Sequence, residues 1–127
     1  MRYNIVAGEE LKKIMGGTIS NPIPFNEDMS VGTFSYEPFN EEFIKERSAV
    51  HHVSPEEYKA KLTDFLSLLK TVKYNDEIHL YFGEDKTCIA NRSLLIEYFG
   101  VKIKTLTLHV VDELSGKEIK EPTIIKE

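Results

Sequence analysis

Residues 77–91 read EIHLYFGEDKTCIAN and contain the clearest strand-to-helix transition of the chain. Residues 77–82 are apolar at nearly every position except His79, which is typical of a strand buried on both faces inside a sheet. A tight Gly-Glu-Asp turn then leads into an amphipathic pattern over residues 87–99, which Gly100 ends. This stretch therefore predicts a buried strand followed by a helix.

A similar strand-to-helix unit opens the chain. Residues 3–7 are predicted to form a short strand that Gly8 ends, and residues 9–15 one or two helical turns. Two prolines make residues 18–24 an extended segment or an edge strand. Because strands alternate with helices, the sequence predicts an α/β fold, with a partly parallel sheet and helices on both faces. Residues 3–7 and 77–82 should be parallel neighbours in its interior.

The middle of the chain is predicted to hold a long loop and a helix. Residues 26–39 contain many turn formers, and one short strand is expected there at residues 30–34. Asn40 is a suitable N-cap for a helix over residues 41–50. Arg47 lies on or beside the apolar face of this helix, so its guanidinium is expected to point inward.

The strongest helix signal begins at Ser54. Pro55 occupies the first helical position, and Glu57 completes an S-x-x-E capping box. Apolar side chains then recur every three or four residues up to Leu69. This pattern predicts one amphipathic helix packed across the sheet.

The longest strand candidate covers residues 102–111, but its apolar positions change phase. Ile103 is odd-numbered, whereas Leu106 and the apolar residues after it are even-numbered. A bulge near residues 104–105 would reconcile the two phases and is expected there.

The length of the chain suits one domain. A chain of 127 residues has room for one hydrophobic core, so residues 1–127 are expected to form a single α/β domain. Residues 112–127 should form a C-terminal strand or tail. Within it we expect a turn at residues 113–116 and an edge strand at residues 117–125.

The net charge, the cysteine count and the length of the apolar runs exclude several classes of function. The formal net charge is −5, and nonspecific binding to nucleic acid needs a basic surface, so nucleic acid is not expected as a partner. The single cysteine excludes an intramolecular disulfide and a Cys-rich zinc site, and it suits a reducing compartment. No apolar run approaches the roughly 18 residues of a membrane span, and residues 5–7 are too short for a signal peptide. We therefore expect a cytoplasmic protein with no membrane partner.

The candidate site is predicted where strands end and helices begin. In open α/β sheets, ligands bind at the carboxyl ends of strands, beside the free N–H groups of helix starts. Gly8 and Asp85 should share that edge of the sheet if their strands are parallel neighbours. The helix after Asp85, the long loop and the inward arginine could face the same cleft. The expected ligand-binding set is Gly8, Asp28, Ser30, Arg47, Asp85, Cys88 and Asn91.

Several of these residues have other interpretations that the sequence leaves open. Cys88 is compatible with a nucleophilic thiol at a helix start, a buried small apolar residue or a pocket-lining residue. Arg47 is compatible with a structural ion pair or with a ligand contact. Asp28 and Ser30 also suit ordinary turn chemistry, in which side chains bond to the nearby backbone.

No sequence motif points to a metal or phosphate site. The turn after the first predicted strand lacks both glycine-rich phosphate-binding patterns, and Glu9 and Glu10 would repel an anion. A cationic or hydroxyl-bearing ligand suits that turn better. His51 and His52 follow a helix end and are weak evidence for a metal, so no metal site is predicted and the cofactor stays open.

Five segments together resemble the bacterial domain of unknown function 1835 family. They are residues 5–9 (IVAGE), residues 25–32 (FNEDMSVG), the helix with Arg47, residues 54–58 (SPEEY) and residues 78–91 (IHLYFGEDKTCIAN). The resemblance covers residues 3–111. It implies a fold and the location of a site rather than an activity, because the family has no settled activity.

The chain departs from the family pattern at two places. The first turn of the family usually reads Gly-Asp-Ser, whereas this chain has Gly8-Glu9-Glu10. After Ser-x-Gly the family commonly continues with Pro-Leu, whereas Thr33 and Phe34 follow here. Both departures lie where the pocket is expected, so a ligand of the family need not be shared.

The sequence is compatible with three functions. The first is binding of a small polar or nucleotide-like ligand in the predicted cleft. The second is a protein-interaction module, such as a regulator or an inhibitor encoded by a mobile element, acting through its acidic surface; a homodimer also fits. The third is a hydrolase or transferase that uses Cys88 or a carboxylate. A concave pocket would favour the first or third, and an exposed apolar patch the second.

Overall fold

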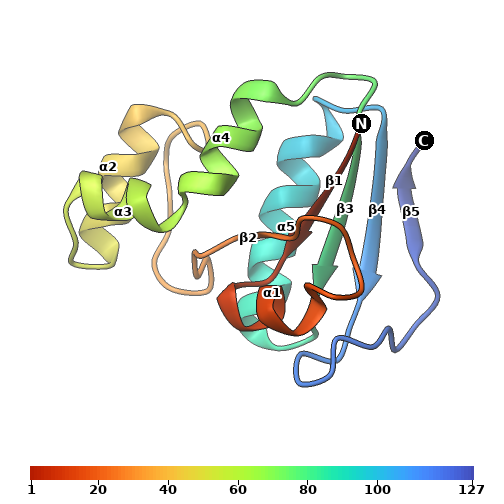
Figure 1. Cartoon of the computed structure of the whole chain (residues 1–127). Helices are drawn as coiled ribbons and strands as arrows, with labels where there is room; N and C mark the ends of the chain where they lie inside the picture. The colour runs from red at the N-terminus through yellow and green to blue at the C-terminus, as the bar shows by residue number, and fades with distance from the viewer.

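A computed structural model describes residues 1–127 as one five-stranded sheet with five helices (Figure 1). The strand order is β2-β1-β3-β4-β5. In chain order the elements are β1 (Arg2–Val6), α1 (Glu9–Met15), β2 (Ile23–Pro24), α2 (Glu41–Val50), α3 (Pro55–Lys61), α4 (Thr63–Thr71), β3 (Glu77–Phe82), α5 (Lys86–Gly100), β4 (Thr105–Val110) and β5 (Thr123–Lys126). The α/β fold with a mostly parallel sheet is as the sequence predicts.

The four strands β2, β1, β3 and β4 are parallel, and β5 is antiparallel at the edge. Ile5 lies opposite Leu80, and Leu80 lies opposite Leu108, so the predicted parallel pairing of β1 with β3 is confirmed. From β1 the chain runs to β2 on one side, and after three helices it returns to β3 on the other side. The strand order therefore reverses between β1 and β3.

Each face of the sheet has a different cover. On one face, Ile5, Leu80 and Phe82 are fully buried in the main core, with side chains from α2 to α5. On the other face, Leu11 and Met15 of α1 pack against side chains at the carboxyl ends of the strands. Figure 1 shows α1 at that end of the sheet and the other helices on the opposite side. Helices on both faces suit the nearly apolar β3. On the face of α1, however, the strands also carry the buried polar side chains of Asn4, His79 and His109.

The helix predicted from Ser54 to Leu69 is in fact two helices, α3 and α4. The Ser54 capping box is present, as the sequence predicts. Leu62 separates the helices with φ −107° and ψ 17°. The Thr63 hydroxyl donates to the carbonyls of Lys59 and Ala60, a back-bonding pattern that often bends helices. The apolar periodicity continues across the break, so the sequence pattern does not indicate that the helix ends at Leu62.

Two further sequence predictions are wrong. Residues 30–34 form a turn followed by irregular backbone rather than a strand. The predicted bulge near residues 104–105 is absent, because Ile103 is buried in the loop before β4 and never joins the strand. The irregularity in register instead occurs between Leu106 and Thr107, in the pairing with β5.

The predicted edge strand at residues 117–125 is shorter in the structure. Its ladder is restricted to β5, and before it Glu118 makes only an isolated bridge with Val111. None of the helices combines the length and the apolar character that crossing a membrane requires.

Candidate functional site

The carboxyl ends of the four parallel strands bring polar side chains to one edge of the sheet. Asn26 and Glu27 follow β2, Gly8 follows β1, Asp85 follows β3, and Glu113 follows β4. The reversal of strand order between β1 and β3 lies at this edge. In open α/β sheets, such a reversal is where ligands bind, because the loops on its two sides diverge.

A hollow of about 280 Å³ lies at this reversal, and we call it the switch-point hollow. Carboxylates line it from three segments, and no lysine or arginine does. Its lining is Ala7, Gly8, Glu9, Glu10, Leu11, Asp85, Thr87, Cys88 and Glu113. Three of the predicted site residues, Gly8, Asp85 and Cys88, are therefore brought together.

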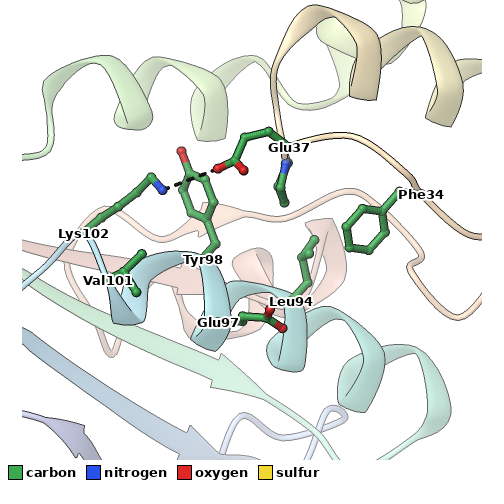
Figure 2. Close-up of a pocket in the computed structure, with 8 residues that line it drawn as sticks. Phe34, Glu37, Leu94, Glu97, Tyr98, Val101 and Lys102 are labelled. Atoms are coloured by element: carbon green, nitrogen blue, oxygen red, sulfur yellow. Dashed lines mark ion pairs between the residues drawn. The ribbon is translucent and has the colours of Figure 1, made fainter.

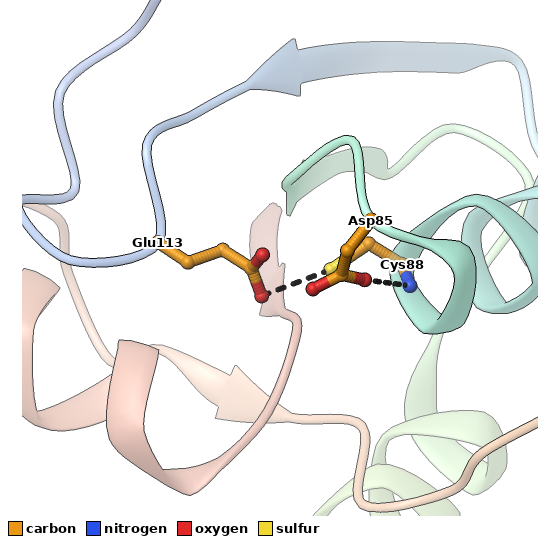
Figure 3. A group of neighbouring side chains, drawn as sticks. All are labelled: Asp85, Cys88 and Glu113. Atoms are coloured by element: carbon orange, nitrogen blue, oxygen red, sulfur yellow. Dashed lines mark hydrogen bonds between the residues drawn. The ribbon is translucent and has the colours of Figure 1, made fainter.

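Asp85 caps a helix in addition to lining the hollow. Its Oδ1 accepts a hydrogen bond from the backbone N–H of Cys88 at 2.7 Å, which makes it the N-cap of α5. Figure 3 shows this bond and the Glu113 carboxyl approaching from the loop after β4. Because the Asp85 carboxylate already occupies the start of the helix, a phosphate would meet a negative charge there.

Glu113 reaches the hollow across Gly83. A Cβ atom at position 83 would lie 2.7 Å from Cγ and Cδ of Glu113, so any larger residue would displace this side chain. One carboxylate oxygen each from Glu113 and Asp85 and the Sγ atom of Cys88, the atoms that could bind a metal, all lie within 4.8 Å of one another. This separation is compatible with one cation, although acidic clusters of this kind are common without a metal.

The pKa values of the Asp85 and Glu113 carboxyl groups are shifted in opposite directions. The neighbouring Glu113 carboxyl, followed by the N–H of Cys88, lowers the pKa of Asp85. The neighbouring Asp85 carboxyl, followed by burial, raises the pKa of Glu113. Two carboxyls this close do not both ionise readily, so the proton stays on Glu113 to a higher pH than on an isolated glutamate.

Cys88 is a buried thiol with a raised pKa. Burial, as the main cause, and the charges of Glu113 and Asp85 raise the pKa of Cys88 to about 12. Its Sγ donates to Glu113 Oε1 at 3.2 Å. Since the thiolate is the reactive form, this environment disfavours the catalytic interpretation. The other two interpretations both describe Cys88, because it is buried and also lines the hollow.

The remaining predicted residues gather around Glu27, which the sequence did not single out. Glu27 has a fully buried carboxylate that forms an ion pair with the equally buried Arg47. Arg47 donates from Nε to Oε2 and from Nη2 to Oε1, both at 3.0 Å. Tyr58 O–H and His51 Nε2 each approach one carboxylate oxygen to 2.5 Å. We call these four residues the Glu27 cluster.

The charged groups of Glu27 and Arg47 are buried inside the protein and are stabilised there by hydrogen bonds. Burial by itself would raise the pKa of Glu27, but hydrogen bonds from Arg47, Tyr58 and the backbone N–H of Asp28 outweigh it and lower the pKa. Arg47 also donates to the carbonyls of Asp28 and Thr33. A buried pair that is this well bonded is costly to break from one side, because the partner left behind would be an unpaired charge.

Asn91 fastens the long loop to α5. Its Nδ2 donates to the Glu27 carbonyl at 2.7 Å, and its Oδ1 accepts from the Met29 N–H at 2.8 Å. Asp28 Oδ1 accepts from both the backbone N–H and the hydroxyl of Ser30. Asp28 and Ser30 thus perform the turn chemistry that was one of their two interpretations.

The single cleft predicted from the sequence corresponds to two adjoining places. Gly8, Asp85 and Cys88 line the switch-point hollow, whereas Arg47 and Asn91 belong to the surroundings of Glu27. Asn26 lies between the two groups, because its Nδ2 donates both to Glu9 Oε1 and to the Lys61 carbonyl. A second hollow, of about 270 Å³, includes Asn26 in its lining, and we call it the Glu27 hollow. Its lining is Asn26, Glu27, Asp28, His51, Val53, Tyr58 and Lys61.

A third hollow, of about 250 Å³, lies away from the carboxyl edge between α5 and the long loop (Figure 2). Its apolar side chains are Phe34, Pro38, Leu94, Tyr98 and Val101. An ion pair between Glu37 and Lys102 at 3.7 Å borders it. We call it the apolar hollow. No pattern in the sequence indicates this surface.

A polar row also crosses the sheet face that α1 leaves open. His79 Nδ1 lies 2.8 Å from His109 Nε2, and His109 Nδ1 lies 2.7 Å from Glu118 Oε1. The Tyr81 ring stacks on His109 at 4.2 Å. Burial, followed by the charges of Arg2 and His109, lowers the pKa of His79. This row bonds neighbouring strands and the tail to one another, and no described hollow reaches it.

Glu27 and Glu113 are the functional candidates that sequence reasoning missed. Ligands bind at the carboxyl ends of parallel strands in open α/β sheets. The sequence prediction considered the ends of β1 and β3 only. The same reasoning at the ends of β2 and β4 would have indicated Glu27 and Glu113. Comparison of the chain with protein-family models, with curated proteins and with solved structures gave no match.

Proposed function

We propose that this chain is a ligand-binding domain, similar to the bacterial domain of unknown function 1835 family, and that the switch-point hollow takes a small, polar, positively charged molecule. The observation that carries the proposal is the lining of this hollow. Glu9, Glu10, Asp85 and Glu113 line it without any basic residue, at the edge where open α/β sheets bind ligands.

The charge of the hollow supports an ammonium group on the ligand rather than a phosphate. A cation next to Asp85 and Glu113 would relieve the repulsion that keeps a proton on Glu113. Binding should therefore release a proton, and the affinity should rise with pH through the raised pKa of Glu113. A nucleotide-like ligand would have to direct its phosphates away from these four carboxylates.

Isothermal titration calorimetry with putrescine tests the proposal, with AMP as the anionic comparison. Putrescine should bind the wild type, and the Asp85→Asn, Glu113→Gln double variant should lose this binding. Asn keeps the N-cap of α5, so the double variant should remain folded. The matched control is Glu84→Gln, because Glu84 is exposed, pairs with Lys120 and does not line the hollow. Binding of AMP but not putrescine, or equal putrescine binding by the double variant, would refute the proposal.

A second candidate function is a protein-interaction module, and the apolar hollow favours it. Val101 at its border is 78 % exposed and Phe34 is 40 % exposed, although both are apolar. Exposed apolar groups around a hollow are typical of surfaces that another protein covers. Sedimentation velocity tests a homodimer at this surface: the wild type should self-associate with rising concentration, and Val101→Asp should remain monomeric.

A further inference from the structure

His51 is held by the Glu27 cluster and faces solvent at the same time. It caps the C-terminus of α2, and its side chain is 24 % exposed, whereas the side chains of Glu27 and Arg47 are fully buried. Its ring is nearly parallel to that of Tyr58, with an interplanar angle of 20°. The imidazole therefore has a fixed orientation at the border of the Glu27 hollow, which it lines.

The contacts of His51 define which ring nitrogen carries the proton. Nε2 lies 2.5 Å from Glu27 Oε1, and the lowered pKa of Glu27 means that this oxygen belongs to a carboxylate, which can only accept. Nε2 must therefore carry a hydrogen and donate it. The 3.3 Å approach of Arg47 Nη2 to the same nitrogen is then a close contact, because both groups are donors.

The other ring nitrogen of His51, Nδ1, makes no hydrogen bond to the protein and is not enclosed. In the neutral ring it carries the lone pair, since Nε2 carries the hydrogen. A carboxylate that orients an imidazole in this way is the arrangement by which a histidine acts as a general base. The same hollow is lined by Lys61, which has no ion-pair partner, and by Asn26 and Tyr58.

We propose that the Glu27 hollow is a hydrolytic site in which His51 is the catalytic base and Glu27 its positioning residue, with a small acyl compound as the substrate. His51 Nδ1 removes a proton from a water molecule, and the water oxygen bonds to the acyl carbon. The bond from this carbon to the leaving group then breaks. The leaving group departs with the electron pair and takes up the proton from Nδ1, so that one water is consumed and an acid is formed.

The surroundings of His51 suit this chemistry. Lys61 is the one lysine among the residues that line the hollow, and in the proposed site its ammonium opposes the negative charge that develops on the acyl oxygen. The charge of Glu27 remains beside the ring and stabilises the imidazolium that forms during the reaction. The Glu27 hollow shares no lining residue with the switch-point hollow, so hydrolysis there would be separate from the binding of a cation.

Turnover of p-nitrophenyl acetate tests the proposal by the release of p-nitrophenolate. The wild type should hydrolyse this ester with repeated turnover, and His51→Gln should be slower by on the order of 10²-fold, the contribution typical of a general base. The amide of Gln can still donate to Glu27, so the variant should keep its fold, which circular dichroism would check. The matched control is His52→Asn, because His52 is the exposed neighbour with φ +58°, a conformation that Asn tolerates, and this variant should keep the wild-type rate.

Nitrogen-15 NMR of the imidazole gives a second readout that does not depend on the substrate. The wild type should show His51 as the Nε2–H tautomer, with an unprotonated Nδ1. Equal ester turnover by the wild type and His51→Gln would overturn the proposal, as would a single stoichiometric burst from acylation of surface amines. The Nδ1–H tautomer in the NMR spectrum would also overturn it.

Discussion

Glu27 and Glu113 occupy comparable places in the fold and have opposite properties. Each follows the carboxyl end of a parallel strand, yet the pKa of Glu27 is lowered and that of Glu113 is raised. Glu27 is the more deeply buried of the two, so burial alone would predict the reverse order. Glu27 is surrounded by donors from Arg47, Tyr58 and the backbone, whereas Glu113 has another carboxyl beside it. The partners of a carboxyl group, rather than its depth, decide its charge here.

This contrast separates two uses of polar side chains at one edge of the sheet. The carboxylate of Glu27 has its lone pairs satisfied inside the protein, and it stabilises the arrangement of the long loop, α2 and α3. The carboxyls of Asp85 and Glu113 repel each other and stay accessible to a cation. Changes at Glu27, Arg47 or Tyr58 should therefore reduce stability, and changes in the switch-point hollow should alter proton or ligand binding.

The largest effect is expected for Arg47→Met. This variant leaves Glu27 buried without its cation, which typically lowers the free energy of unfolding by about 3–5 kcal/mol. Urea denaturation followed by circular dichroism would measure the loss. The Glu27→Gln, Arg47→Met double variant removes both charges and should lose less than the sum of the single variants. A loss below about 1 kcal/mol in Arg47→Met would contradict the structural ion pair.

An intermediate effect is expected for Tyr58→Phe. Burial, as the main cause, and the charge of Glu27 raise the pKa of Tyr58, so its O–H stays protonated and donates to Glu27. Removal of one hydrogen bond to a charged group should lower the free energy of unfolding by about 1.5–3 kcal/mol. The same urea titration measures it, and Tyr74→Phe is a matched control, because Tyr74 is exposed and lies outside the cluster. Equal losses in the two variants would mean that the hydroxyl of Tyr58 contributes nothing.

The smallest effect, and the one with a pH dependence, is expected for Glu113→Gln. Between the ordinary glutamate pKa of about 4.3 and the raised pKa of Glu113, the folded state holds more protons than the unfolded state. The contribution of Glu113 to stability is therefore present at low pH and is lost as the pH rises through this window. Relative to the wild type, the variant should gain stability from about pH 4 towards pH 7, by about 0.5 kcal/mol or less. Thermal melts across this range would check the sign, and a relative gain towards low pH would contradict it.

Much of the fold could be predicted because its signals are local. The capping box at Ser54, the cap at Asn40 and the apolar run of β3 each act within a few residues of sequence, and all three are present. The break at Leu62 could not be predicted from periodicity, because the apolar stripe continues through it. Ile103 suggests a strand because it is apolar, but it is buried without belonging to one.

The candidate site was less accessible to sequence reasoning. Arg47 could be singled out because it lies beside the apolar face of its helix, and the structure buries it completely. Its partner Glu27 is 20 positions away in a loop full of polar residues, where an acid normally faces water. Glu113 is 25 positions from Cys88 and enters the hollow only because the sheet places β4 beside β3. Such pairings depend on topology, which no local pattern records.

The bonds of the Glu27 cluster also bear on the order in which the chain folds. Glu27 is joined to residues 20, 31 and 64 positions further along, in α2, α3 and α5. Closing loops of this length costs chain entropy that short-range contacts do not require, so these bonds should form after the individual helices they join. The long loop has no helix or strand of its own and is largely exposed, so it should be released before the sheet. Cleavage within residues 29–38 by a protease would then report the opening of the cluster before the sheet unfolds.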